Sequence, residues 1–330
     1  MPAYAARRSV PESNESKVVT STWTLVADGV SAPEGPTLGP DGWILNVCSF
    51  SRPENPRVVG GDIVATHPDR PGDTRRLFNT SFGGVEGIPA ALAFGPDGCL
   101  YVTDEGHRAI LRANDDGELT VHIRSPNGPN DLSFDSNGNL WFTDPWGSDI
   151  DNAIGCVYVL PSGERALEQV AEGLAFPNGI VTTDEKVIYA ETRTNRLWCH
   201  RRVPEGGLGA AELFAELSHQ HGVEVQGPDG MCLDVQGNLY VAHFGAGCVR
   251  ILDSYGTELD CLAVPGCNPT NLCFGGADMA TLFVTLDDTD EVVARRAPHA
   301  GASIQFCPQR QQHSGACDGW IDFITRSPAL

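Results

Sequence analysis

The sequence predicts an all-β protein, a six-bladed β-propeller with a central metal-binding channel. One phrase, a tight turn followed by an alternating apolar strand, recurs six times along the 330 residues. Successive turns are 40 to 56 residues apart, and no sustained helical periodicity separates them. Short strands repeated at roughly this period are typical of propeller blades. The metal is predicted by a further observation, the recurrence of oxygen-bearing side chains at one position of the phrase.

The turns are the first element of each phrase, and we expect one blade per phrase. Asp-Gly at 41–42 and 97–98 and Asn-Gly at 137–138 tolerate the positive φ that two-residue hairpins require. The turn markers are Gly42, Gly98, Gly138, Lys186, Gly237 and Met279. The six phrases occupy residues 37–49, 93–106, 133–147, 181–195, 232–245 and 273–288.

The strands are the second element. In the third phrase Leu140 and Phe142 alternate with Trp141, which is the pattern of a half-buried strand. A closed ring also needs one terminal strand to complete a blade. Residues 23–26 and 291–296 are both candidates for that strand.

The domain organisation follows from length and composition. Residues 1–20 are polar and contain Pro and Ser, so we expect a flexible tail followed by a single propeller domain over 21–330. No stretch resembles a signal peptide or reaches membrane-spanning length. Eleven cysteines, an odd number placed mostly in apolar strands, predict buried thiols in a reducing compartment, and hence a cytoplasmic protein.

The charge balance excludes some partners. The chain has 43 acidic and 22 basic residues and a net charge of −21, so its surface repels polyanions. Nucleic acid and anionic membranes are therefore not expected as partners. The excess of carboxylates serves solubility or attracts a divalent cation, and composition alone leaves both interpretations open.

One register links the blades. Eight residues before each of the first five turn markers, the chain has a residue that directly follows a proline; the sixth phrase has Pro269 followed by Thr270 and Asn271. Equivalent positions in a propeller are related by rotation about the channel, so oxygen-bearing side chains in this register converge. The register residues are Glu34, Ala90, Asn130, Asn178 and Asp229.

The convergence predicts a metal site formed by Glu34, Asn130, Asn178 and Asp229. Two carboxylates and two amides buried together without compensation are unfavourable, and a cation removes that cost. Oxygen ligands favour Ca²⁺, with Mg²⁺ or Mn²⁺ as alternatives, and Zn²⁺ or Fe²⁺ also remain possible. The register contains no Cys or His, which argues against a tetrahedral structural zinc site. Taken singly, each Asn or Asp is equally explained by bonds to local backbone groups.

Six motifs surround this register: PEGP (33–36), SPNGPNDL (125–132), FTDP (142–145), FPNGI (176–180), GPDGM (227–231) and PTNLCFGG (269–276). Together they resemble the SMP-30/gluconolactonase/LRE-like family of six-bladed propellers, over about residues 23 to 293. The resemblance implies a metal-dependent hydrolase acting on lactones, with the ion held by Glu34, Asn178 and Asp229. Asn130 matches a fourth position that contacts the metal, bound water or substrate.

The expected reaction is opening of the ester bond of a sugar (aldono) lactone. The ion would polarise the carbonyl, Asp229 would act as general base, and Asn130 would belong to the catalytic set. Two alternatives remain: phosphotriester hydrolysis at the same ion, because relatives include organophosphate hydrolases, and a non-catalytic scaffold with a structural ion. Neither a Gly-x-Ser-x-Gly elbow nor a His-Glu-x-x-His helix is present in the sequence.

Four further residues are candidates for substrate binding. His243 follows the fifth strand phrase, although a histidine in a strand is equally explained by packing. His221 belongs to a loop with a second histidine, near the expected channel mouth. Trp146 lies in a loop after the third phrase that forms either a pocket wall or an ordinary surface connection. Asn271 lies two residues after Pro269, the proline that marks the register in the sixth repeat.

Overall fold

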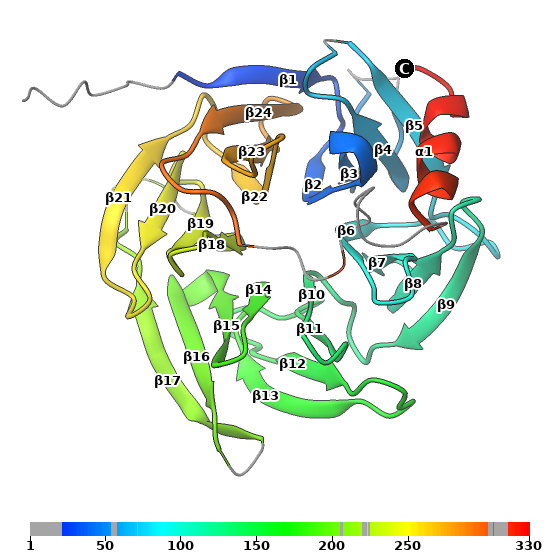
Figure 1. The fold of residues 1–330 in the computed structure, drawn as a ribbon. Coiled ribbons are helices and arrows are strands. Elements are labelled where there is room, and N and C mark those ends of the chain that lie inside the picture. The colour runs from blue at the N-terminus through cyan, green and yellow to red at the C-terminus, as the bar shows by residue number, and fades with distance from the viewer. Residues whose placement is uncertain are drawn as a thin grey trace, which may run out of the picture.

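The protein is a ring of six antiparallel four-stranded sheets around a central channel, which confirms the six-bladed propeller (Figure 1). The computed structural model describes residues 22–53, 58–70, 72–204, 207–219, 223, 225–302, 306 and 316–330. The tail expected at 1–20 lies outside the described residues. In each of blades 1 to 5 the strands follow one another from the channel outward in chain order.

The first three blades come from the N-terminal half of the chain. Blade 1 consists of β2 (Pro33–Leu38), β3 (Ile44–Cys48), β4 (Asp62–Thr66) and β5 (Thr74–Asn79), with the 3₁₀ turn η1 (Pro40–Gly42) between β2 and β3. Blade 2 consists of β6 (Pro89–Phe94), β7 (Leu100–Asp104), β8 (Ala109–Ala113) and β9 (Leu119–Arg124). Blade 3 consists of β10 (Leu132–Phe134), β11 (Leu140–Asp144), β12 (Gly155–Leu160) and β13 (Glu168–Leu174).

The remaining blades complete the ring. Blade 4 consists of β14 (Pro177–Thr182), β15 (Lys186–Glu191), β16 (Arg196–Arg202) and β17 (Leu208–Glu216), with η2 (Thr192–Thr194) after β15. Blade 5 consists of β18 (Gly227–Leu233), β19 (Leu239–Phe244), β20 (Cys248–Leu252) and β21 (Glu258–Ala263). Blade 6 consists of β22 (Pro269–Gly275), β23 (Thr281–Leu286), β24 (Glu291–Arg296) and β1 (Thr24–Asp28).

The first and the last strands of the chain meet in blade 6. Strand β1 is the outermost strand of that blade and pairs antiparallel with β24, with Thr24 opposite Ala294 and Asp28 opposite Glu291. Both terminal segments that were candidates for closure are therefore used, side by side. The strand from the N-terminus therefore supplies the fourth strand of the last blade and joins the two ends of the propeller in one sheet.

The turns differ in part from the expected two-residue hairpins. In blade 1 Asp41 and Gly42 both have positive φ, but the hydrogen bond from Gly39 N to Trp43 O encloses three residues instead of two. In blades 2 and 3 only the glycine has positive φ, and the equivalent hydrogen bonds, from Gly95 N to Cys99 O and from Asp135 N to Asn139 O, also enclose three residues. A three-residue loop with its last residue in the left-handed region is the next most common hairpin geometry, so the same glycine serves a longer turn.

The strands are more deeply buried than their alternation predicts. All five residues of β11 are buried, whereas a half-buried strand was expected. Phe142 packs into an apolar cluster with blade 2, and Trp141 packs into another with blade 4. Because neighbouring blades cover both faces of each inner strand, both sets of alternating side chains lie in a core.

Hydroxyl groups tie neighbouring blades together at the level of the ligand register. Thr192 Oγ1 donates to Pro228 O at 2.8 Å and Thr270 Oγ1 donates to Pro33 O at 2.8 Å. Ser49 Oγ donates to Pro89 O at 2.7 Å in the same way. Each of these acceptor prolines precedes a register residue, so the bonds hold the register at one height around the ring.

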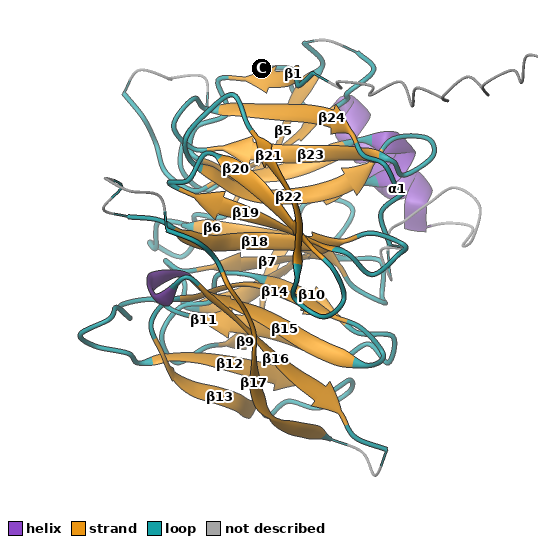
Figure 2. Cartoon of the chain, turned by 90° about the vertical axis from the view of Figure 1, so that its left-hand side faces the viewer, coloured by secondary structure: helices purple, strands orange, loops and turns teal. Residues whose placement is uncertain are grey.

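The C-terminal helix α1 (Ala316–Arg326) was not predicted. It packs beside β5 and η1, outside the ring of strands (Figures 1 and 2). Trp320 and Ile324 are one turn apart and enter the apolar cluster between blades 1 and 2, and Trp320 Nε1 donates to Gly98 O at 3.0 Å. Trp320, Phe323 and Ile324 form an apolar stripe at helical spacing, but a helix of 11 residues is marginal on its own, and the blade surface stabilises it. No described helix is long and apolar enough to cross a membrane.

The cysteines agree in part with the expectation of buried thiols. The structure describes the side chains of nine of them, all of which are free, and six of these are buried. Cys261 and Cys267 are exposed and Cys232 is half-buried. Burial raises the pKa of the Cys248 thiol to about 12, so this thiol stays protonated and behaves as a small apolar side chain.

Candidate metal centre and active site

Local irregularities turn the register residues toward the channel. Strand pairing shifts on the inner strand of five blades at the register position, for example between Glu34 and Thr37 and between Pro228 and Met231. A bulge frees a residue from the ladder and re-aims its side chain. The other shifts lie between Pro89 and Ala91, between Pro177 and Ile180, and between Pro269 and Leu272.

Glycines after the register residues allow the inner strands to approach one another. A Cβ atom at Gly179 would overlap the carbonyl oxygen of Asp229, and one at Gly230 would overlap the side chain of Asn271. The Pro-x-Gly phrases of blades 4 and 5 therefore serve close packing at the axis as well as the bulge. This contact brings Asn178 and Asp229 from adjacent blades to one point.

The four predicted ligands line one cavity of 270 Å³ at the end of the channel where the inner strands begin. Glu34, Asn130, Asn178 and Asp229 all belong to its wall. The register residue of blade 2, Ala90, is also there but carries no oxygen. The rest of the lining is Ala32, Ser49, Phe50, Ile88, Pro89, Glu105, Trp146, Phe176, Phe244, Thr270 and Asp287.

Two oxygens of the candidate ligands have no partner among the described residues. Asp229 Oδ1 and Asn178 Oδ1 are buried and accept no hydrogen bond from this part of the chain. Buried polar atoms without a partner are rare, because each costs the free energy of its lost hydration. Asn178 Nδ2 is 3.3 Å from Thr192 Oγ1, and this contact turns the amide oxygen away from Thr192. The donor set is thus short of a positively charged partner and fits an oxygen-ligated cation.

The electrostatics of the cavity also favour a bound cation. Burial, and next to it the charge of Asp229, holds the pKa of Glu34 well above its usual range. Burial and the neighbouring Asp131 and Asp287 do the same for the pKa of Asp229. The lining contains no Lys, Arg or His among the described residues. A bound divalent cation would compensate these carboxylates and lower both pKa values.

The composition of the site limits the kind of metal. No group of three or more His, Cys, Asp or Glu in the described part of the chain lies close enough to hold an ion. The candidate ligands are instead two carboxylates and two amides. Amide oxygens and carboxylates suit a hard cation such as Ca²⁺.

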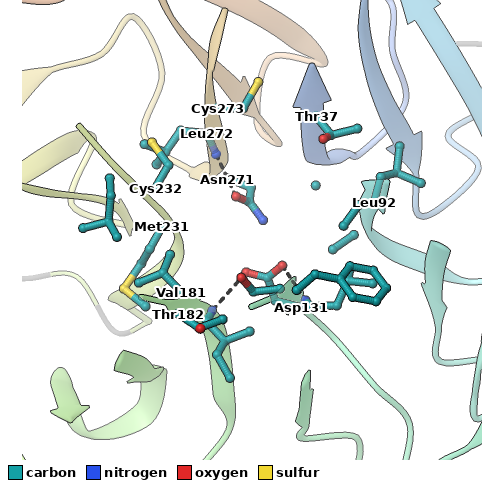
Figure 3. A pocket seen from close by; sticks show the side chains of 18 of the residues that line it. Thr37, Leu92, Asp131, Val181, Thr182, Met231, Cys232, Asn271, Leu272 and Cys273 are labelled. Atoms are coloured by element: carbon teal, nitrogen blue, oxygen red, sulfur yellow. Dashed lines mark hydrogen bonds between the residues drawn. The ribbon is translucent and has the colours of Figure 1, made fainter. Parts of the chain in front are cut away.

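Behind the ligands the channel opens into a second cavity of 360 Å³, shown in Figure 3. Asp131 and Asn271 both point into it, and the remaining wall is mostly apolar. The carboxylate of Asp131 accepts hydrogen bonds from Leu132 N at 2.8 Å and Ile180 N at 3.1 Å. Burial raises the pKa of Asp131 to about 7.

The predicted substrate-binding residues lie in different parts of the structure. Trp146 lies at the mouth of the ligand cavity with 37 % of its surface exposed. Asn271 lines the second cavity rather than the first, and its Oδ1 accepts a hydrogen bond from Leu272 N at 2.8 Å. His221 lies outside the described residues.

His243 does not reach the cavity, which corrects its expected role in substrate binding. It is fully buried, and its Nε2 lies 2.9 Å from Asn195 Oδ1 while Arg250 Nε lies 3.2 Å from its Nδ1. Burial, together with the charge of Arg250, lowers its pKa to about 4. The alternation of β19 points this residue between blades 4 and 5, where it is a neutral packing group.

Sequence reasoning missed Glu105, which follows β7 and lines the ligand cavity. It is outside the proline register, so the repeat did not mark it. The positions after β3 and β23, Ser49 and Asp287, also line the cavity. Inspection of the residue that directly follows the second strand of each blade would therefore have found Glu105.

The sequence profile of the SMP-30/Gluconolactonase/LRE-like region matches residues 59–287. The chain belongs to this family. Among curated proteins, lactonase drp35 of Staphylococcus haemolyticus (strain JCSC1435) is 30 % identical over 279 residues, which is 79 % of each chain. The family assignment agrees with the resemblance of the channel motifs.

Two solved structures share the fold of this SMP-30/gluconolactonase/LRE-like protein. A gluconolactonase of Xanthomonas campestris aligns with a TM-score of 0.66 and 21 % identity, over 84 % of this chain and 90 % of the other. Regucalcin, a calcium-binding protein of Agrobacterium tumefaciens strain C58, aligns with a TM-score of 0.66 and 20 % identity, over 84 % and 95 %. At this level of identity the likeness establishes the fold.

Proposed function

We propose that this protein is a divalent-metal-dependent lactonase that opens the ester bond of a sugar lactone. The observation that carries the proposal is the convergence of Glu34, Asn130, Asn178 and Asp229 on one cavity, where two of their oxygens lack a partner among the described residues. Relatives named as lactonase and gluconolactonase support the choice of substrate class.

The ion is proposed to be Ca²⁺, held by the same four side chains. The oxygen-only donor set supports this choice, as does the relative named as a calcium-binding protein. When bound there, the ion supplies Lewis-acid polarisation of the lactone carbonyl. Phe50 and Trp146 line the cavity and are exposed to solvent, so substrate is proposed to enter from their side.

Asp229 is the proposed general base. Asp229 lines the cavity with a carboxylate of two oxygens, so one oxygen can bind the ion while the other receives a proton from the attacking water. The water oxygen bonds to the carbonyl carbon, the bond to the ring oxygen breaks, and the ring oxygen leaves as a hydroxyl after taking up the proton. The product is the open-chain hydroxy acid.

Asn130 is proposed to orient the reactants. Its backbone N–H is fixed by Thr143 O at 3.0 Å, which leaves the side-chain amide at the cavity wall. An amide in this place donates to an oxygen on which negative charge develops and accepts from the attacking water. Lactones are activated esters, so a base weakened by a nearby cation is sufficient.

The lining supports a neutral substrate. It combines carboxylates with aromatic walls and has no basic side chain among the described residues, so an anionic compound would be repelled. A lactone ring with its hydroxyl groups presents C–H faces to Trp146 and hydrogen-bond donors to the carboxylates. The product acid is anionic, so the carboxylates of the lining repel it and favour its release.

The test is hydrolysis of aldonolactones, aliphatic lactones and phosphotriesters, followed by proton release. Chelated protein is compared with protein reconstituted with Ca²⁺, Mg²⁺, Mn²⁺ or Zn²⁺, and with Asp229→Ala. We expect metal-restored lactone hydrolysis that Asp229→Ala abolishes. Preference for phosphotriesters would reassign the reaction, and metal binding without turnover of either class would indicate a structural ion.

A further inference from the structure

Glu105 is a buried carboxylate of the cavity that the ligand set does not use. It lines the cavity, and only 6 % of its surface is exposed. Asn130 Nδ2, at 3.4 Å, is its one side-chain hydrogen-bond donor among the described residues. No ion pair of the described residues involves it, and a 3.4 Å contact is too long to satisfy a carboxylate.

A comparison with blade 6 shows what Glu105 lacks. Asp287 follows the second strand of that blade, as Glu105 follows the second strand of blade 2, and both line the cavity. Asp287 is paired with Arg52, whose Nη2 lies 2.5 Å from its Oδ1. Glu105 has no such cation among the described residues. Its carboxyl oxygens are therefore available to accept hydrogen bonds from a ligand that enters the cavity.

The structure does not make Glu105 a third carboxylate of the metal centre. Glu34, Asp229 and Glu105 are all described, yet no three carboxylates are close enough together to hold an ion. Blade 2 also has Ala90 at the ligand register, so this side of the cavity carries no ligand. The space beside Ala90 is therefore left for substrate.

We propose that Glu105 is a specificity-determining residue that accepts a hydrogen bond from a hydroxyl group on the lactone ring. The inference rests on the proposed lactonase function and deepens it by naming the residue that selects hydroxylated lactones over unsubstituted ones. A carboxyl group accepts a hydrogen bond in either protonation state, so the role does not depend on its titration. A buried acceptor left unpaired disfavours a substrate that lacks the donor.

The test compares D-glucono-δ-lactone with δ-valerolactone, which has the same ring and no hydroxyl groups. The variants are Glu105→Met, which keeps the length and removes the acceptor, and Glu105→Gln, which keeps a neutral acceptor. For Glu105→Met we expect kcat/KM to fall about 10- to 100-fold on gluconolactone and less than about 3-fold on valerolactone. Glu105→Gln is expected to recover part of the loss on gluconolactone.

Two readouts other than turnover separate this role from a structural or metal-binding one. Ca²⁺ affinity measured by calorimetry should be the same in Glu105→Met and wild type, and the melting temperature should be unchanged or higher because an unpaired buried carboxyl is removed. A tenfold loss of Ca²⁺ affinity would overturn the inference in favour of a ligand role. Equal losses on both lactones would also overturn it. If wild type hydrolyses neither lactone, the proposed function fails and the inference with it.

Discussion

Thr192 orients Asn178. The amide Nδ2 of Asn178 lies 3.3 Å from Thr192 Oγ1, and the same hydroxyl donates to Pro228 O at 2.8 Å. One side chain therefore fixes which face Asn178 turns to the cavity and anchors the residue before Asp229. Two candidate ligands from adjacent blades depend on this hydroxyl.

Thr192→Val should weaken metal binding without disturbing the fold. Valine has the same shape but cannot hold the Asn178 amide, and loss of a group that orients a ligand typically costs 10- to 100-fold in affinity. We expect a loss of about that size in Ca²⁺ titration calorimetry. Thr66→Val is the matched control, because Thr66 is buried in β4 and its hydroxyl group hydrogen-bonds to that of Thr74. Unchanged Ca²⁺ affinity in Thr192→Val would remove Asn178 from the ligand set or Thr192 from its support.

Asp229→Asn should stabilise the metal-free protein and abolish stabilisation by Ca²⁺. Burial raises the pKa of Asp229, so the folded state binds a proton more tightly than the unfolded state does. For such a carboxyl, stability falls as pH rises above the unfolded pKa of about 4, and the penalty is present at pH 7. The asparagine carries no charge and avoids the penalty. Melting curves of wild type and variant at pH 7, with chelator and with millimolar Ca²⁺, test this prediction. If the melting temperature of the wild-type protein does not change when Ca²⁺ is added, the metal site is contradicted.

His243 should contribute to acid sensitivity. Its pKa is lowered to about 4 by burial and by Arg250, against about 6.5 in the unfolded chain. The unfolded state then binds the extra proton, so stability is full above pH 6.5 and falls as pH decreases toward 4, by about 3 kcal/mol at most. We expect His243→Gln to show a smaller loss of unfolding free energy between pH 7 and 4.5 in urea titrations. His299→Gln, at an exposed position, is the control; identical pH profiles of His243→Gln and wild type would refute the assignment.

Trp320→Ala should destabilise the protein while leaving the cavity intact. Trp320 is 1 % exposed and fills the cluster between blades 1 and 2, and truncation of a buried tryptophan costs about 3 to 5 kcal/mol. Denaturant unfolding measures the loss, and Asp322→Ala on the exposed side of α1 is the control. Ca²⁺ affinity below the unfolding transition should stay at the wild-type value. A stability equal to wild type would mean that α1 is not docked in solution.

The sixfold sequence repeat was sufficient to predict most of the fold and the residues at the centre of the candidate site. Because blades are related by rotation, one register read along the chain was sufficient to place Glu34, Asn130, Asn178 and Asp229 on a common wall. Local chemistry supports the same positions, since proline, bulge and glycine recur around them. Information of this kind repeats with the blades and is visible in a linear sequence.

Other features depend on contacts between segments that no local pattern links. Glu105 reaches the cavity through the end of β7, His243 is held by Asn195 from the neighbouring blade, and α1 forms only against blades 1 and 2. The sequence by itself determined the number of blades, their order and the ligand register, because each is encoded in a short repeat. The tertiary structure decided which side chains face the cavity and which are packed behind it, because that depends on how adjacent blades cover each other's faces.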